Sequence, residues 1–429
     1  MSYRNLVALI FFTLSLSAEE TLYWPDKHGP TLNGLVPQGD LKKIPLHWGD
    51  KGKNIAWKTA LEGFGHSSPI IAGDKIWFTA ANATGTKQFI YCLNRINGKV
   101  IHHKLLFENK NPELLGNRIN TYATPSCVLE TGFVYVHFGT YGTACLNSKT
   151  AEVVWQRRDI KARHFRGPAS SPLLYKHLLI LSFDAVDRQF TVALNKSTGE
   201  QVWLTKRSVD YKDLVDGKPK REGDYRKAFN TPSLAEIGDH VQLLSVGARA
   251  AYGYDVLTGK EIWTVRHKNM NAAVRPLWVS EHQMAVINTG SSRATLLGLK
   301  LDKSKKGDLT DDVSWTQKRG SRYCLPLYFE GNLYQITHDG TISCSDLKTG
   351  EKHWSKSLPN KFMASPLLIG SRIYMFDEFG KTIIIEASAK SFKVIAENEI
   401  DAEVSASPAA ADGALFIRTK KALYKISHK

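Results

Sequence analysis

Seven residues of this sequence are of types that bind ligands or move protons, and one of them, Arg275, interrupts an otherwise regular pattern. These candidate ligand-binding residues are His66, Tyr122, Asn230, Arg275, Tyr323, His338 and Asp377. A mixture of imidazole, phenol, amide and guanidinium groups suits an anionic or polar ligand better than an apolar one. We therefore expect a binding site for a polar small molecule, and no residue is assigned as catalytic.

Two of these residues allow a second interpretation. His338 and Asp339 could form a catalytic pair, but they precede Gly340, and Asp-Gly is typical of a hairpin turn. Asp377 and Glu378 could help to hold a divalent cation, although adjacent carboxylates on a loop are commonly solvated. We predict no metal site, and the sequence shows no nucleophile, base and orienting group of a hydrolase.

The five cysteines do not form a motif for metal binding or redox chemistry. There is no Cys-x-x-Cys and no adjacent pair, whereas a Cys127–Cys145 bridge stays open as an alternative. Three of the five occupy a repeated position that Ala193 and Gly253 fill elsewhere, so we expect small structural core residues. The cysteines are Cys92, Cys127, Cys145, Cys324 and Cys344.

The elements that must position these residues belong to a repeat with two anchors. The first anchor is a residue followed by proline and an apolar run, and it occurs eight times at spacings of 40 to 60 residues. Its copies are Ser68-Pro69, Thr124-Pro125, Ser171-Pro172, Thr231-Pro232, Arg275-Pro276, Leu325-Pro326, Ser365-Pro366 and Ser407-Pro408. Proline is tolerated near the start of a strand, where no ladder donor is needed.

The second anchor is a turn followed by an inward-facing tryptophan, as in "YDVLTGKEIW" at 254–263. Asp or Asn at the head of the turn accepts backbone N–H bonds, and glycine takes a positive φ. We expect the tryptophans to dock structurally between repeats; they are Trp57, Trp155, Trp203, Trp263, Trp315 and Trp354. Two hairpin strands lie between the anchors, which gives four antiparallel strands in each repeat.

Eight such repeats predict an all-β fold, an eight-bladed β-propeller of four-stranded antiparallel blades. The eighth copy lacks its last strand, and "NIAWKTAL" at 54–61 could supply it, because Trp57 lies 12 residues before Pro69. The predicted domains are a signal peptide at 1–17, an N-terminal extension at 18–53 and the propeller at 54–429. An N-terminal strand would then complete the last blade and close the ring.

The N-terminus and the charge suggest where the protein works. Residues 1–17 hold Arg4, an apolar run and small residues, which is a secretory pattern. A helix of this run would span only about 17 Å of a hydrocarbon core of about 30 Å, so no permanent membrane span is expected. The net charge of +16 attracts anions, but the basic runs lack interleaved aromatic residues, and nucleic acid is not favoured.

The turn pattern of "GYDVLTGKEIW" resembles the tryptophan-docking repeat of pyrroloquinoline quinone (PQQ) propellers, which include quinoprotein alcohol dehydrogenases and BamB-like envelope proteins. The N-terminal "YWPDKHGPTLNGLVP" looks like secreted PQQ-like propellers of planctomycete and verrucomicrobial type. The resemblance covers 22–429. It implies an eight-bladed PQQ-like propeller that is secreted or periplasmic.

Two functions follow from this resemblance. The first is a non-catalytic binding or assembly module, whose partner would be an envelope protein, an anionic polymer or a small molecule. The second is a quinoprotein-type dehydrogenase, a PQQ-dependent oxidoreductase with PQQ and calcium on the channel face. The sequence requires no cofactor, and the adjacent cysteine pair of quinoprotein alcohol dehydrogenases is absent. We favour the binding module. A carbohydrate-active propeller is a third alternative, which would need two carboxylates about 5 to 10 Å apart.

Overall fold

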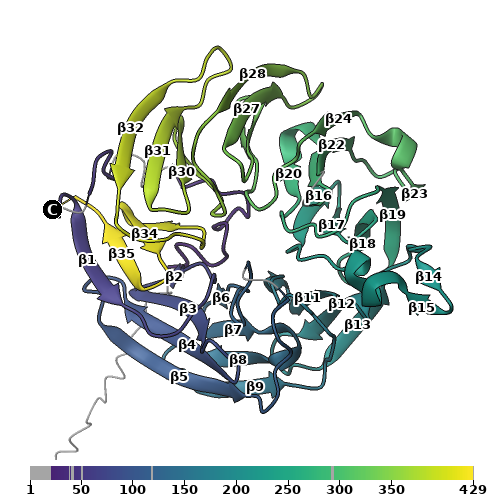
Figure 1. Cartoon of the computed structure of the whole chain (residues 1–429), viewed down its shortest axis with the longest axis horizontal. Coiled ribbons are helices and arrows are strands. Elements are labelled where there is room, and N and C mark those ends of the chain that lie inside the picture. Colours follow the sequence, from purple (N-terminus) through teal and green to yellow (C-terminus); the bar gives the residue numbers. More distant parts are fainter. Residues whose placement is uncertain are drawn as a thin grey trace, which may run out of the picture.

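The computed structural model of the chain describes residues 21–37, 39, 43–49, 52–116, 119–290 and 294–428. The predicted signal peptide lies outside these residues. Eight antiparallel sheets follow one another along the described chain and surround a central channel (Figure 1). The predicted eight-bladed β-propeller is confirmed.

Each of the first four blades is built from four consecutive strands, ordered from the channel outwards. Blade 1 consists of β2 (Ile70–Ala72), β3 (Lys75–Ala81), β4 (Lys87–Asn94) and β5 (Val100–Glu108). Blade 2 consists of β6 (Val128–Glu130), β7 (Phe133–His137), β8 (Thr143–Asn147) and β9 (Val153–Arg157). Blade 3 consists of β10 (Leu173–Tyr175), β11 (Leu178–Asp184), β12 (Gln189–Asn195) and β13 (Gln201–Lys206). Blade 4 consists of β16 (Ser233–Ile237), β17 (His240–Val246), β18 (Ala250–Asp255) and β19 (Glu261–Arg266).

The next three blades repeat the same order. Blade 5 consists of β20 (Leu277–Val279), β21 (Met284–Asn288), β22 (Thr295–Lys300) and β24 (Trp315–Lys318). Blade 6 consists of β25 (Leu327–Phe329), β26 (Asn332–Ile336), β27 (Thr341–Asp346) and β28 (Lys352–Ser357). Blade 7 consists of β29 (Leu367–Ile369), β30 (Arg372–Phe376), β31 (Lys381–Glu386) and β32 (Val394–Glu399).

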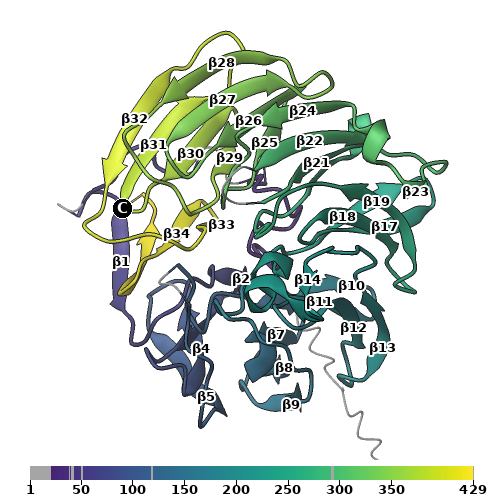
Figure 2. The same ribbon diagram turned by 45° about the vertical axis from the view of Figure 1, so that its right-hand side comes forward.

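Blade 8 joins the two ends of the chain. Its inner strands are β33 (Ala409–Ala411), β34 (Ala414–Arg418) and β35 (Ala422–Ile426), and its outer strand is β1 (Ile55–Ala60). Both views show β1 beside these C-terminal strands (Figures 1 and 2). The predicted closure by an N-terminal strand is confirmed, and it leaves no open edge between the first and last blades.

The remaining elements are short insertions. The hairpin β14 (Leu214–Val215) and β15 (Lys218–Pro219) lies beside blade 4 (Figure 1). Strand β23 (Gly307–Asp308), from the lysine-rich insertion of blade 5, pairs in parallel with β19 and gives blade 4 a fifth strand. The 3-10 turns are η2 (Gly139–Tyr141), η3 (Lys220–Arg226), η4 (Ser280–His282) and η5 (Thr310–Asp312).

The tryptophan of one blade contacts the turn of the next blade. Trp155 of blade 2 donates its indole N–H to Lys196 O of blade 3 at 2.8 Å. A Cβ on Gly199 of that turn would lie 2.7 Å from the Trp155 ring, so only glycine lets the ring approach this closely. The indoles of Trp57, Trp203, Trp315 and Trp354 likewise donate to carbonyls of the following blade's turn.

Two positions depart from this rule for different reasons. Trp263 donates to Gln242 Oε1 of its own blade at 2.8 Å, because the insertion that forms β23 stands where blade 5 would offer a turn. Within the described residues, the Trp263 indole thus makes no hydrogen bond to a turn of blade 5, but the ring shares a buried cluster with Leu297 and Leu299 of blade 5. His102 takes the tryptophan place in blade 1, where its Nε2 lies 3.1 Å from Lys149 O in the turn of blade 2.

The small residues that the repeat demands lie opposite these docking side chains. Cys145 pairs across the ladder with Trp155, and Cys344 pairs with Trp354. All five cysteines are buried and free, so the alternative of a Cys127–Cys145 bridge is not formed. At this repeated position the backbone packs under an aromatic ring, which leaves room only for a small side chain.

A matched pair of glycine variants tests the docking seam at the ring closure. Gly98 has φ +72° in the turn that receives Trp57, and an added Cβ would lie 2.7 Å from the ring. Gly132 has φ +86° with nothing within 4 Å of an added Cβ. Both alanine variants strain the backbone by about 1 kcal/mol, and Gly98→Ala adds about 1 to 3 kcal/mol of overpacking. We expect a lower urea midpoint for Gly98→Ala than for Gly132→Ala; equal midpoints would contradict the docking contact.

Candidate functional site

The N-terminal strap, residues 21–37, enters the central channel and is fixed at both ends by backbone bonds to inner strands. Trp24 exchanges N–H···O bonds of 3.0 and 2.8 Å with Ile71 of β2. Val36 N–H donates to Leu368 O of β29 at 2.9 Å, and Leu368 N–H donates to Gly34 O at 3.0 Å. The strap is seen as the dark purple trace in the middle of the ring (Figure 1).

A buried ion pair anchors the strap inside the channel. Arg275 of blade 5 binds Asp26 through two bonds, Nη1 to Oδ1 at 2.5 Å and Nη2 to Oδ2 at 2.9 Å. Its Nε donates to Pro232 O of blade 4 at 3.1 Å, and its side chain has no solvent exposure. This two-pronged geometry fixes the position of the next residue, Lys27.

A belt of hydroxyl groups joins the inner strands around the channel, at the position two residues before each of them. Ser68 N–H donates to Ser126 Oγ at 2.8 Å, Ser126 N–H to Ser171 Oγ at 2.9 Å, and Ser171 N–H to Thr231 Oγ1 at 2.9 Å. On the other side, Leu325 N–H donates to Ser365 Oγ and Ser365 N–H to Ser407 Oγ, both at 3.0 Å. The belt gives a physical reason for the serines in the proline anchor.

The belt also explains two irregular copies of the anchor. In blade 2 the belt position is held by Ser126 and not by Thr124, so the sequence anchor Thr124-Pro125 is displaced by two residues relative to the strand. In blade 5 the position belongs to Arg275, whose guanidinium replaces the hydroxyl link with its bond to blade 4. The belt is thus interrupted at the place where the strap is anchored.

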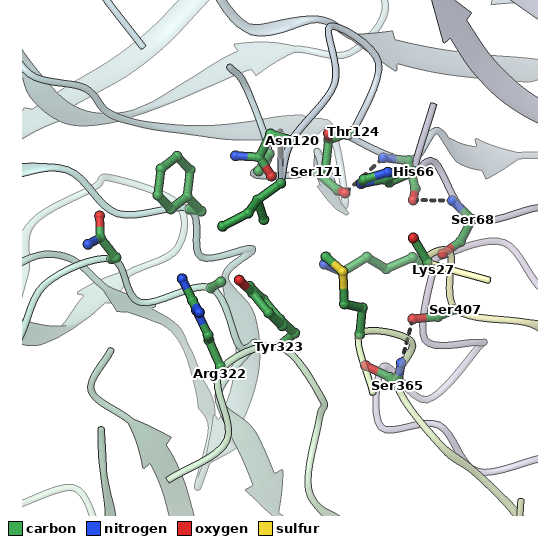
Figure 3. A pocket seen from close by; sticks show the side chains of 18 of the residues that line it. Lys27, His66, Ser68, Asn120, Thr124, Ser171, Arg322, Tyr323, Ser365 and Ser407 are labelled. Carbon is green, nitrogen blue, oxygen red and sulfur yellow. Dashed lines mark hydrogen bonds between the residues drawn. The ribbon is translucent and has the colours of Figure 1, made fainter. Parts of the chain in front are cut away.

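A cavity of about 400 Å³ lies above the strap in the channel. Figure 3 shows Lys27 reaching into it from one side and Tyr323 and Arg322 from the other. Its lining residues are Lys27, His28, His66, Ser68, Ile119, Asn120, Thr124, Ser126, Arg166, Ala169, Ser171, Asp224, Phe229, Met270, Asn271, Ala273, Arg322, Tyr323, Met363, Ser365, Ser405 and Ser407.

The charges that line this cavity are predominantly positive. Asp224, the one carboxylate among the lining residues, is paired with Arg166 at 3.6 Å and with Lys227. Arg322 stacks over the Tyr323 ring at 5.1 Å, and its buried Nε has no partner among the described residues. Lys27 forms no hydrogen bond or ion pair with any described residue. Two cations therefore face the cavity without a compensating anion.

Desolvation changes the pKa values of Lys27 and His28, the two residues that the strap contributes to the cavity lining. Burial, together with the neighbouring Arg275 guanidinium, lowers the pKa of Lys27 from 10.5 to about 7, against a smaller opposing effect of Asp26. Lys27 is half-buried, and its side chain lines the cavity. Burial also lowers the pKa of His28 well below 6.5, with Lys27 and Arg275 adding to the effect. His28 is therefore neutral at physiological pH.

Of the seven residues predicted from the sequence, His66 and Tyr323 line the cavity. Burial, with Arg418 and Lys420 nearby, lowers the pKa of His66 to about 4. His338 lies behind Tyr323, with the two rings edge to face at 5.2 Å, and its Nδ1 contacts Phe362 O at 3.1 Å. Tyr323 and His338 come from loops of blade 6, and His66 comes from the loop that leads into blade 1.

The other four predicted residues lie outside the lining, and neighbouring groups of the protein occupy their polar atoms. Tyr122 donates to Glu113 O at 3.0 Å, and Asn230 bonds Val274 O and Val246 N–H. Asp377 accepts the N–H groups of Phe379 and Lys381 and the amide of Asn360. Arg275 is held by Asp26 as described above. In these four residues the protein itself engages the polar atoms named here, and a ligand contact stays a prediction.

The seven candidates selected from the sequence do not include Lys27 and Arg322, the two residues with the clearest chemistry, although the sequence does place Arg322 in a loop on the channel face. Arg322 is the sequence neighbour of Tyr323, so the correct loop was identified, and only one of its two adjacent residues was selected. Lys27 belongs to the extension before the repeat, where repeat positions give no guidance. The one usable signal was the cluster "PDKHG" at 25–29, in which three ionisable residues adjoin in an otherwise unpatterned segment.

The search for metal ligands and membrane spans is negative over the part of the chain that the structure describes. No group of three or more histidine, cysteine, aspartate or glutamate side chains is placed to hold a metal ion there. In the same residues, no helix has the length and apolar character needed to cross a bilayer.

Comparisons with known proteins agree with this architecture. The family model for the outer membrane protein assembly factor BamB matches residues 251–391. A comparison with curated proteins gives no match. The resemblance to PQQ-repeat, BamB-like propellers that the sequence indicated is confirmed for this segment.

Solved structures extend the similarity of fold to most of the chain. BamB from Moraxella catarrhalis has a TM-score of 0.56 at 13% identity, covering 87% of this chain and 99% of BamB. Quinohemoprotein alcohol dehydrogenase from Comamonas testosteroni has a TM-score of 0.63 at 12% identity, covering 95% of this chain and 81% of the enzyme. One neighbour is an assembly factor and the other is an enzyme, so the fold alone does not separate the two functions.

Replacing Lys27 tests whether the amine is desolvated as described. Since the folded pKa is about 7 and the ordinary value is 10.5, the unfolded chain binds more protons between these limits. Lys27 therefore destabilises the fold at low pH, and the penalty disappears as the pH rises through 10.5. We expect Lys27→Met to raise the thermal midpoint at pH 6 and to lose this gain by about pH 10. Lys348→Met, at an exposed turn, is the control; an equal response of both variants would contradict the placement of Lys27.

Proposed function

We propose that this protein is a non-catalytic binding or assembly module, located in the periplasm or secreted, whose channel cavity takes a small anion rich in hydrogen-bond acceptors. The observation that supports this proposal best is the excess of positive over negative charge in the cavity lining. Lys27 and Arg322 supply positive charge without an anionic partner, and the lone carboxylate of the lining is already neutralised.

The serine belt adds neutral donors to these cations. Ser126, Ser171 and Ser407 each accept a backbone N–H through Oγ and line the cavity. A hydroxyl group that accepts in this way still has its proton to donate. A ligand with several carboxylate or phosphate oxygens would satisfy these donors together, whereas an uncharged apolar molecule would leave two cations buried and unpaired.

The residues of the cavity do not fit a calcium ion with PQQ. Calcium takes six to eight oxygen ligands, usually several carboxylates. Asp224 is the single carboxylate of the lining and is engaged by Arg166 and Lys227. The described residues offer no alternative cluster of ligands, and the channel centre holds an amine in place of an anionic group. The binding module is therefore favoured over the quinoprotein-type dehydrogenase.

The location and the partner are proposed on a different basis. The matched family model is named for an outer membrane assembly factor, and the sequence begins with a secretory pattern. An envelope protein or an anionic envelope polymer is therefore the partner class that we would examine first. The small anion would occupy the cavity, and the larger partner would contact the surface around it.

Calorimetric titration with citrate tests the anion site. Binding should be about tenfold weaker at pH 8 than at pH 6, because the protonated fraction of an amine with a pKa of about 7 falls from roughly nine-tenths to one-tenth. Titrations in two buffers of different ionisation enthalpy should show proton uptake on binding. Arg322→Gln should weaken binding about tenfold or more, whereas Lys348→Gln should not. Equal affinities of the wild type and Arg322→Gln would contradict the proposal.

A spectroscopic experiment separates this proposal from the dehydrogenase. The purified protein would be incubated with PQQ and calcium, washed, and examined for a retained quinone chromophore and for alcohol oxidation with an artificial electron acceptor. We expect no calcium-dependent retention and no turnover. Retained chromophore together with alcohol turnover would establish the dehydrogenase and overturn the binding module.

A further inference from the structure

The position of the Lys27 amine suits a covalent reaction with a ligand as well as the electrostatic binding of an anion. It projects from the turn of the strap into the cavity and makes no bond with the described residues (Figure 3). Its backbone is fixed, because the preceding Asp26 is bound at two points by Arg275 and the following His28 bonds Ser365 through Nε2 at 3.2 Å. A fixed, unpartnered amine in a cavity with limited access to water is the arrangement of lysines that attack carbonyl groups.

We propose that Lys27 captures a small 2-oxo acid as a Schiff base, with the carboxylate of that ligand bound by Arg322 and the serine belt. This inference rests on the proposed anion site and adds the reactive group of its ligand. In the reaction, Nζ attacks the carbonyl carbon, a C–N bond forms, and the carbinolamine loses one water molecule to give C=N. No oxidant or reductant is consumed, and the step is reversible.

The charged groups around Lys27 favour this reactivity at neutral pH. Asp26 lies beneath the amine but is bound to Arg275, so the strap offers no free carboxylate to hold the ammonium form. His28 and His66 are neutral in the folded protein, the Arg275 guanidinium disfavours a positive charge on Lys27, and Asp224 is compensated by Arg166 and Lys227. The pKa of about 7 leaves a large fraction of the amine unprotonated at physiological pH.

The aromatic and donor groups across the cavity indicate why an oxo acid fits better than a simple aldehyde. Tyr323 and Arg322 approach from the side opposite Lys27, with the guanidinium stacked on the phenol ring. A 2-oxo acid carries a carbonyl group for the amine and a carboxylate for the guanidinium. A neutral aldehyde would react with the Lys27 amine but would leave the Arg322 guanidinium desolvated and unpaired.

Reductive trapping on the full-length protein tests the inference. Glyoxylate and sodium cyanoborohydride at pH 7 convert a Schiff base into a stable secondary amine, and peptide mapping by mass spectrometry locates it. Surface lysines with a pKa near 10.4 are almost entirely protonated at this pH, so we expect Lys27 to be modified at least about tenfold faster than the exposed Lys348. Modification of Lys27 at the rate of Lys348 would overturn the proposal.

Variants and a second aldehyde separate this inference from the anion site. Arg322→Gln should slow modification of Lys27 by glyoxylate but not by propionaldehyde, and citrate should protect Lys27 from both reagents. Lys27→Arg should bind citrate and yield no trapped adduct at that position. Citrate binding without preferential trapping would overturn the Schiff base and leave the anion site intact. Trapping that is equally fast with both aldehydes and independent of Arg322 would overturn the oxo-acid assignment.

Discussion

The pair formed by Asp26 and Arg275 determines what the channel of this propeller can contain. It joins residues 249 positions apart, and both side chains are almost completely removed from water. Desolvating two charges is expensive, and a doubly hydrogen-bonded geometry with a further bond from Nε to Pro232 O offsets much of that cost. The pair stands where Arg275 interrupts the hydroxyl belt, and it holds the strap, which contributes Lys27 and His28 to the cavity lining. Without it, neither the position nor the desolvation of Lys27 would be defined.

The ring could be predicted from the sequence because its signals are local and repeated. A proline anchor, a turn with positive-φ glycine and a docking tryptophan recur in enough copies that single failures do not hide the pattern. Each departure from the repeat pattern has a physical cause. Trp263 lacks a following turn and bonds within its own blade, and the anchor of blade 2 is displaced because Ser126 takes the belt position. A local pattern identifies a blade but does not identify the partner of each side chain in the next blade.

The site was predictable only in part, because its parts do not share a repeat position. His66 and Tyr323 were found, since loops before inner strands surround the channel in any propeller. Arg275 was noticed as a break in the pattern, but its partner Asp26 lies in the extension, and no spacing rule connects the two. The same reason explains why Lys27 was missed. A polar residue that interrupts a repeat can have its hydrogen bonds made by another part of the chain, as Asp26 does for Arg275, and it is then not available to a ligand.

The belt serines combine a structural role with a recognition role, and this combination limits the ligands that the cavity can accept. Their oxygen atoms receive backbone N–H groups from the neighbouring blade, so rotating a serine away to suit a donor ligand would break a bond between blades. The cavity is therefore fixed as a donor surface by the same bonds that join the ring. An acceptor-rich ligand meets this surface without any rearrangement, and it also meets the Lys27 amine, which is partly unprotonated at neutral pH. Because its pKa is lowered by burial, Lys27 reduces the stability of the fold at neutral pH, so the most reactive group of the cavity carries an energetic cost.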